Sequence, residues 1–240
     1  MPSVKLVVIG CSPAWHNPDG AESGYLIEGE KRLLLDCGPG VFSSLRKRDG
    51  WPRVDAIAIT HFHLDHWGDL VPWTFGASFG PGRGSPKPEL WLPPGGVETL
   101  ASFTVKLNAD PLFDAFSVRE YEEDVAFSAA GFQIVPVRVL HYDLNAFGFR
   151  VSNGEKVLAY SGDSGPSPSL ATLARGADLF VCEATLAAPE PAMRGHLTQA
   201  EALAAHSESG AKRLLVVHRP DELPLDDGIE RAWDGYETSV

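Results

Sequence analysis

The sequence predicts an α/β fold in which short strands and helices follow one another along the chain. Short runs of apolar and β-branched residues recur, and segments with helical spacing separate several of them. The 240 residues include 24 Gly and 19 Pro, which favours short elements joined by tight loops over a helical bundle. Four potential metal ligands follow one predicted strand directly, and open α/β sheets bind their ligands at this carboxyl edge.

The first half of the chain predicts a strand, a hairpin, a helix and a further strand. A loop with Pro13, Pro18 and Gly20 connects the first strand to the hairpin, and the helix follows a Gly-Pro-Gly tract. The predicted bounds are residues 5–10 for the first strand, 24–28 and 32–36 for the hairpin, 41–48 for the helix and 54–60 for the last strand.

The middle of the chain gives weaker signals. Residues 67–79 are aromatic and indicate either a helix or the wall of a pocket, and the Gly- and Pro-rich residues 80–88 indicate a flexible connection. The acidic residues 110–125 give no clear pattern. A strand is predicted at residues 89–93, a helix at 97–107 and a strand at 132–140. Pro136 puts the centre of that last strand at a sheet edge or a bend.

The second half of the chain repeats the order of the first. A hairpin turns at Asn153-Gly154, and Thr198 with Glu201 forms the sequence of a capping box that opens a helix. The predicted bounds are residues 146–151 and 156–160 for the hairpin, 169–174 for a helix, 179–182 for a strand, 199–209 for the capped helix and 214–217 for the last strand.

The pattern His-x-His-x-Asp-His at residues 61–66 begins where the strand at 54–60 ends. Side chains two residues apart in an extended segment point to the same side, so His61 and His63 can bind one cation together. Asp65 adds a hard oxygen ligand beside His66, and this pair suits a second divalent ion. The pattern therefore predicts two half-sites that still need ligands.

Three more potential ligands lie just past predicted strands: His141, Asp163 and His218. The chain has only 8 His, and five of them belong to this arrangement. A single His at a strand end is usually structural, but its recurrence at several strand ends indicates a metal site.

Charge and cysteine content limit the partners. The net charge of −12 argues against large nucleic acids, because phosphate neutralisation needs a basic face, and the basic run Arg46 to Arg48 with Arg53 nearby is read as a solvated helix end. Cys11, Cys37 and Cys182 are widely spaced and predict buried thiols in a reducing compartment. No stretch is long enough for a signal peptide core or a membrane span, so we expect a soluble cytoplasmic protein without a membrane partner.

The ligand pattern resembles that of the metallo-β-lactamase superfamily. The tracts at residues 160–164 (YSGDS), 182–185 (CEAT) and 195–198 (GHLT) are similar to those of its ribonuclease Z group. The tracts at 10–12 (GCS) and 23–26 (SGYL) look most like those of compact bacterial phosphodiesterases that act on cyclic nucleotides.

This resemblance implies a single hydrolase domain over residues 1–240 with an αββα sandwich, in which two mixed sheets pack face to face with helices outside. It implies two divalent ions, zinc by default, although manganese and iron occur in relatives. By resemblance, the ligands of one ion are His61, His63 and His141, those of the other are Asp65, His66 and His218, and Asp163 bridges them.

The resemblance also implies a mechanism. Two neighbouring cations would acidify a bridging water, and Asp65 would orient the resulting hydroxide for in-line attack on a phosphodiester. His196 would protonate the leaving alkoxide while Glu183 holds it in place. Asp36, at the end of a strand, would hold a ligand in position.

Several functions stay open at this level. The main hypothesis is a dinuclear phosphodiesterase for a small substrate such as a cyclic nucleotide. A second is a tRNA 3′ endonuclease like ribonuclease Z, but only two short strands lie between His141 and Asp163, with no room for the arm that grips tRNA. A third is a lactonase or thioesterase, and a fourth is a binding protein without turnover. The aromatics Trp67, Trp73, Phe75 and Phe79 would line a pocket or a homodimer contact.

Overall fold

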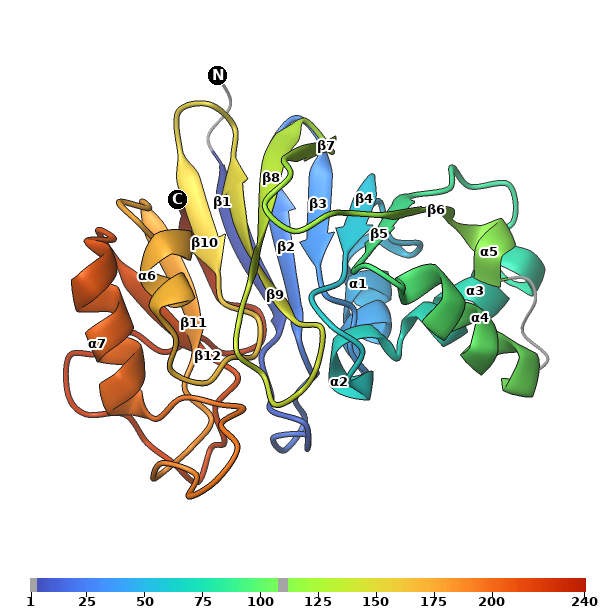
Figure 1. Cartoon of the computed structure of the whole chain (residues 1–240). Helices are drawn as coiled ribbons and strands as arrows, with labels where there is room; N and C mark the ends of the chain where they lie inside the picture. Colours follow the sequence, from blue (N-terminus) through green and yellow to red (C-terminus); the bar gives the residue numbers. More distant parts are fainter. Residues whose placement is uncertain (1–3, 108–111) are drawn as a thin grey trace.

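Two β-sheets pack face to face and are covered by helices on both outer sides (Figure 1). The computed structural model describes residues 4–107 and 112–240. In spatial order, the first sheet contains β13 (Glu237–Ser239), β1 (Lys5–Gly10), β2 (Gly24–Glu28), β3 (Arg32–Leu35), β4 (Ala56–Ala58), β5 (Glu89–Leu92) and β6 (Ser117–Glu120). The second contains β12 (Leu214–Val217), β11 (Leu179–Glu183), β10 (Val157–Tyr160), β9 (Phe147–Ser152), β8 (Phe132–Arg138) and β7 (Phe127–Ala129).

The helices form the two outer layers. Figure 1 shows α1, α3, α4 and α5 beside the first sheet on the right, and α6 and α7 outside the second sheet on the left. The helices are α1 (Val41–Asp49), α2 (Leu64–Trp67), α3 (Leu70–Phe79), α4 (Gly96–Leu107), α5 (Leu112–Ala115), α6 (Pro168–Leu173) and α7 (Gln199–Ser209). This arrangement is the αββα sandwich that the family resemblance implies.

Apolar side chains alternate between the two faces of the strands and form three apolar layers. In β1, Leu6 and Val8 face the space between the sheets, whereas Val7 and Ile9 face the helices. The layer between the sheets also contains Phe149 and Val181 of the second sheet, and a separate layer lies under α6 and α7. Both faces of the central strands are therefore buried, and so these strands read as continuous apolar runs.

The strand and hairpin predictions agree with the structure in most places. Both hairpins are antiparallel, with β2 on β3 and β9 on β10, and the strands that follow them pair in parallel. Thr198 and Glu201 form the predicted capping box at the start of α7. The strand predicted at 54–60 is shorter, since only Ala56–Ala58 pairs with both neighbours.

The structure defines the middle of the chain, where the sequence signals for helices and strands are weak. Residues 67–79 are mostly helical, as the first alternative had it, whereas residues 80–88 are irregular. Residues 110 and 111 lie outside the described residues, and α5, β6 and a loop follow them. Pro136 pairs with Phe149 of β9 at a point where the β7 ladder, which ends at Ile134, no longer covers β8. On that side the backbone N–H of Asp124 donates to Pro136 O at 2.9 Å, so a loop instead of a strand borders β8 here, and β8 itself is not an edge strand.

One prediction about exposed aromatic residues is wrong in part. Trp67 and Trp73 are 4% and 1% exposed, and the Trp73 ring lies 5.3 Å from that of Phe42 in the layer under α1 and α3. Neither is exposed enough for a homodimer contact. Trp73 nevertheless lines a pocket of about 340 Å³ together with Trp51, so the pocket alternative holds for this residue, whereas Trp67 is a core residue. Phe75 and Phe79 are exposed, so the homodimer contact stays a prediction for these two alone.

Two further predictions concern the cysteines and the membrane. All three cysteines are buried and free, as expected from their spacing. Among the described residues, no helix combines the length and the apolar composition that crossing a bilayer requires.

Candidate metal centre

The predicted ligands meet at one edge of the sandwich because each follows a strand of one of the two sheets. His61 comes after β4 and leads into α2, which carries Asp65 and His66 at the lower edge of Figure 1. From the second sheet, His141 follows β8 and Asp163 follows β10, and His218 is the residue after β12. Strands of both sheets therefore deliver their ends to the same place.

Two groups of side chains are close enough to share a cation each. In both groups, all the potential ligand atoms lie within 4.8 Å of one another. The first group is His61, His63, His141 and Asp163, and the second is Asp65, His66, Asp163 and His218. The grouping matches the sequence prediction, including Asp163 as the shared member, and the role of each residue as a ligand stays a prediction.

Outer hydrogen bonds orient the histidine rings toward a common centre. The Nδ1 atoms of His61, His66, His141 and His218 each face a protein oxygen, belonging to Thr60, Asp36, Gly195 and Thr185 respectively, at 2.6 to 3.0 Å. These partners leave the Nε2 atom of each ring for the centre. His63 is reversed, since its Nδ1 lies 2.9 Å from Nε2 of His141.

Unsatisfied buried atoms show that the residues fit a cation. His61 Nε2, His66 Nε2 and Asp163 Oδ1 are fully buried and have no hydrogen-bond partner among the described residues. Buried polar atoms without a hydrogen-bond partner are rare. Such an atom loses its hydrogen bonds to water on folding and gains none in the protein, which destabilises the folded state. Three of them at one point, all of them good donors to divalent metals, are explained by a bound cation.

Burial and charge adjust the protonation states of the centre. Burial lowers the pKa of His61 well below its usual value, and the neighbouring His66 and His141 add to this effect. Burial would raise the pKa of Asp65, but His66 and the hydrogen bond to His218 hold that pKa well below its usual range. His61 and Asp65 are thus in the forms that bind metal, a neutral imidazole and an ionised carboxylate. His66 differs, because Asp163, Asp36 and Asp65 outweigh its burial and raise its pKa well above the usual value, so it must lose a proton when metal binds.

Asp36 lies behind the centre and connects the two sheets. Its carboxylate is fully buried, 2.7 Å from His66 Nδ1, and it accepts hydrogen bonds from the Thr60 backbone and the Tyr160 hydroxyl. Asp36 follows β3 of the first sheet and Tyr160 ends β10 of the second. Asp36 therefore has the position that the sequence predicted for it, in contact with a ligand.

His196 and Glu183 form a hydrogen-bonded pair beside the centre. His196 Nδ1 lies 2.8 Å from Glu183 Oε1 and 3.9 Å from Asp163 Oδ2. Burial would lower the pKa of His196, but the Glu183 carboxylate, followed by Asp163, outweighs it and raises that pKa from 6.5 to about 9. Glu183 is buried and also accepts backbone N–H groups of Ser164 and Thr185. Its carboxylate is therefore better placed to hold His196 than to bind a third cation with His196 and His218, although these three also lie close together.

Sequence reasoning missed several residues around the centre. Tyr142 has a positive φ of 48°, and its hydroxyl donates to Glu190 at 2.8 Å. Its ring lies flat against Gly195, where an added Cβ would come within 2.1 Å of it, so only glycine fits. Two signals could have found Thr60 and Thr185: Thr60 directly precedes His61, and Thr185 ends the tract 182–185 that resembles the ribonuclease Z group.

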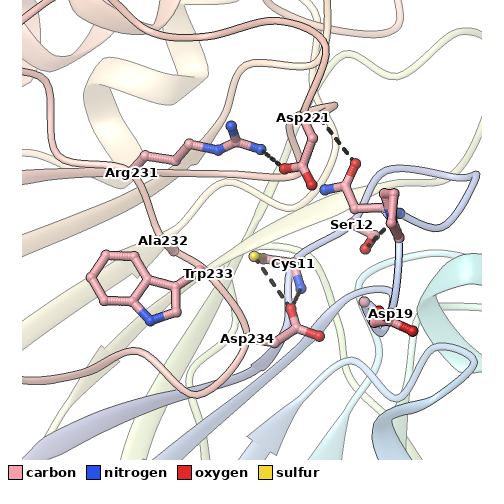
Figure 2. Close-up of a pocket in the computed structure, with 11 residues that line it drawn as sticks. Cys11, Ser12, Asp19, Asp221, Arg231, Ala232, Trp233 and Asp234 are labelled. Carbon is pink, nitrogen blue, oxygen red and sulfur yellow. Dashed lines mark hydrogen bonds and ion pairs between the residues drawn. The ribbon is translucent and has the colours of Figure 1, made fainter.

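The C-terminal segment holds the loop before β2 against the centre. Asp234 accepts hydrogen bonds from the backbone N–H of Cys11 and of Ala21, at 3.2 and 2.6 Å. Figure 2 shows Asp234 beside Cys11, with Trp233 and Arg231 along the wall of the same pocket, which has a volume of about 380 Å³. One carboxylate thus fixes both ends of the loop 11–21.

Comparisons with known proteins agree with this fold and site. Residues 31–219 match the model of the beta-lactamase superfamily domain. The chain is 32% identical to the uncharacterized protein Rv1339 of Mycobacterium tuberculosis, over 99% of this chain and 89% of the relative. It is 26% identical to ribonuclease Z of Myxococcus xanthus, over 100% of this chain and 99% of the relative.

A solved structure has the same fold. The probable metallo-hydrolase YhfI of Bacillus subtilis is 28% identical over 90% of this chain and 87% of its own length. Its crystal structure superposes with a TM-score of 0.85, covering 99% of this chain and 100% of that one, at 24% identity. The chain therefore belongs to the beta-lactamase superfamily and carries the His/Asp metal site of a metallo-hydrolase.

Proposed function

We propose that this protein is a metal-dependent phosphodiesterase for small substrates, with cyclic nucleotides as the leading candidates. The observation that carries the proposal is the arrangement of two His/Asp groups that share Asp163, with the His196–Glu183 pair beside them. The compact bacterial phosphodiesterases that the N-terminal tracts resemble act on cyclic nucleotides, and this favours that substrate class.

The site suits a negatively charged diester despite the acidic protein. His61, His63 and His141 would hold one ion, and Asp65, His66 and His218 the other, with Asp163 between them. Bound divalent ions, zinc in the first instance, would acidify a water molecule and neutralise charge on the phosphoryl oxygens. The positive charge of two such ions exceeds the charge of the two aspartates, so the local field attracts an anion that the net charge of −12 would repel.

The residues of the chain would then complete the reaction. Asp65 orients the attacking water, and His196 donates a proton to the leaving alkoxide. Glu183 keeps the His196 ring in place through the 2.8 Å contact to Nδ1, which leaves Nε2 for the substrate. A positioned general acid of this kind contributes about 10²- to 10⁴-fold to a rate. A poor leaving group such as a sugar alkoxide needs this proton, whereas the thiolate of a thioester leaves without it.

Shape and charge argue for a small substrate instead of tRNA. Between His141 and Asp163 the chain forms only β9, β10 and their turns. The alignment with the Myxococcus ribonuclease Z runs over 309 positions, although this chain has 240 residues, so that relative carries insertions that this chain lacks. The net charge of −12 also works against binding a polyanion.

One set of assays tests the proposal against its alternatives. Purified protein loaded with zinc or manganese is assayed on bis(p-nitrophenyl) phosphate, 3′,5′-cyclic AMP, a lactone and a precursor tRNA. We expect turnover of the two small diesters and little of the others. Absence of phosphodiester turnover with either metal would overturn the proposal, and processing of the tRNA would favour the ribonuclease Z alternative.

A further inference from the structure

Glu22 is a buried acid that the proposed mechanism leaves unused. The residue is 5% exposed and lies between the loop 11–21 and β2. No donor among the described residues hydrogen-bonds its carboxylate, and its one ion-pair partner is His16, whose Nδ1 lies 3.6 Å away on a half-exposed side chain. A carboxyl group this buried normally has hydrogen-bond partners, because losing water is costly. The Glu22 carboxylate therefore has free acceptor positions that water or a bound ligand can fill.

The backbone around Glu22 is attached to the metal centre. Ser23 N–H donates to the backbone oxygen of Asp65 at 3.2 Å, and Gly38 N–H donates to the oxygen of Ser23. A Cβ placed on Gly38 would lie 1.9 Å from Asp65 O and 2.9 Å from the Glu22 Cβ. Glu22 thus lies against the segment that carries Asp65 and His66.

Glu22 lies beside the centre but is not one of its potential metal ligands. It belongs to none of the three groups of described residues whose ligand atoms lie within 4.8 Å of one another. Its oxygens are also absent from the fully buried atoms that lack a partner, so they keep some access to solvent. An incoming ligand can therefore reach them.

The loop that ends at Glu22 is rigidly held. Asp234 fixes Cys11 and Ala21, the residue before Glu22, as Figure 2 shows for Cys11. Within the loop, Asn17 N–H donates to Ser12 Oγ at 3.1 Å, and the Asn17 amide donates to Arg219 O, next to His218. A group held in this way loses little conformational entropy when a ligand binds.

The chemistry of the missing donor follows from the substrate class. Burial raises the pKa of Glu22 to about 7, and positive charge on the centre, such as bound cations would add, lowers it and favours the ionised form. In that form the carboxylate only accepts hydrogen bonds, and it repels phosphoryl oxygens. In a nucleotide, the donors nearest a phosphodiester are the hydroxyl groups of the sugar. The geometry points to Glu22 as a specificity-determining residue that accepts a hydrogen bond from the ribose 2′-hydroxyl of the substrate. This assignment rests on the proposed function.

Calorimetric titration tests the assignment without depending on turnover. Zinc-loaded protein is titrated with 5′-AMP and with 2′-deoxy-5′-AMP, which differ only in the hydroxyl group. We expect the wild-type protein to bind 5′-AMP about 10- to 100-fold more tightly, since hydrogen bonds to charged groups have this strength. Glu22→Ala should bind both nucleotides equally. Glu22→Gln keeps the shape of the side chain and should lower the preference for 5′-AMP over 2′-deoxy-5′-AMP about fivefold. This variant provides the test if Glu22→Ala does not fold.

The matched control is His16→Ala, which removes the neighbour of Glu22 and leaves the carboxylate, and it should keep most of the preference. A wild-type preference near one, or an unchanged preference in Glu22→Ala, would overturn the assignment. So would loss of zinc from Glu22→Ala, because Glu22 would then support the metal centre. Failure of the proposed function is a separate result, seen as absence of cyclic AMP turnover by the wild-type protein.

Discussion

The orientation of single imidazole rings decides whether the centre can bind metal. Each ring except that of His63 turns Nδ1 outward to an oxygen of the protein, and Asp36 is the only carboxylate among these partners. A carboxylate behind a ligating histidine fixes the tautomer and makes Nε2 more basic.

Asp36→Asn should therefore weaken metal binding about 10- to 100-fold. A chromogenic chelator that competes for zinc measures this affinity. The control is Tyr160→Phe, which removes a hydroxyl that donates to the same Asp36 oxygen at 2.8 Å and leaves the carboxylate, so it should have a smaller effect. Unchanged zinc affinity in Asp36→Asn would show that Asp36 does not act through His66.

The His196–Glu183 pair predicts a pH dependence. A general acid acts in its protonated form, so kcat should fall as the pH rises through the His196 pKa of about 9. Glu183 raises that pKa, and Glu183→Gln should move the alkaline limb toward 6.5. The pH profile of kcat on 3′,5′-cyclic AMP measures this shift.

His196→Ala should lower kcat on cyclic AMP about 10²- to 10⁴-fold and leave zinc content unchanged. The loss on bis(p-nitrophenyl) phosphate should be smaller, because p-nitrophenolate leaves without a proton. Equal losses on both substrates, or a pH profile that Glu183→Gln does not move, would contradict the role of a general acid.

Single residues differ in how far the sequence could predict them. His61 to His66, His141, Asp163 and His218 were found because each follows an apolar strand, and strand ends are visible as the end of a pattern. Glu22 and Tyr142 were missed, since their positions depend on loops. Glu22 lies beside the Asp65 segment at the end of a loop whose last residue, Ala21, is held by Asp234, more than 200 residues later. No local pattern carries that information.

At the scale of elements, the Asp234 carboxylate holds both ends of the loop 11–21 in place. Asp234→Ala would leave the Cys11 and Ala21 N–H groups without their acceptor, at about 1–3 kcal/mol for each group that stays buried. Urea denaturation should show this loss of stability, and amide exchange should speed up at Cys11 and Ala21. The matched control is Asp221→Ala, whose carboxylate is 54% exposed and, among the described residues, forms an ion pair with Arg231 alone, and it should change stability by less than about 1 kcal/mol. Equal stability of the two variants would contradict the role of Asp234.

Elements that bury an apolar face were predictable, and exposed edge strands were not. The capping box of α7 and both hairpins have strong local signals. By contrast, β6 and β13 lie at the two ends of the first sheet, and most of their residues are exposed or half-buried. When both faces of an edge strand are exposed to solvent, apolar and polar residues do not alternate along it, and its sequence therefore does not indicate a strand.

At the scale of the whole molecule, residues alone predicted the α/β class and the metal site, and the αββα sandwich came from resemblance to a family. The order of strands within each sheet could not be predicted, because pairings such as β1 with β13 join the two ends of the chain. Such pairings depend on how the whole sandwich closes. The common edge of the two sheets was nevertheless implied by ligands at several strand ends.

The metal centre joins the two sheets, so we expect bound metal to stabilise the entire fold. His61, Asp65 and His66 belong to the first sheet's side, and His141, Asp163 and His218 follow strands of the second. Without a cation, His61 Nε2, His66 Nε2 and Asp163 Oδ1 have no hydrogen-bond partner among the described residues. A ligand that binds only the folded state adds about 2.7 kcal/mol at 100 times its Kd. Treatment with EDTA should therefore lower Tm by several degrees, and zinc should restore it, as differential scanning calorimetry can measure.

His66→Ala removes one of these nitrogens and should abolish most of the zinc-dependent rise in Tm. His206→Ala is the matched control, because His206 lies on α7 and its Nε2 faces the Ala211 backbone oxygen instead of the centre. That variant should keep the full response to EDTA and zinc, whatever its own stability. An equal loss of the zinc response in both variants would mean that metal acts elsewhere. A wild-type Tm that EDTA does not change would mean that no cation links the two sheets.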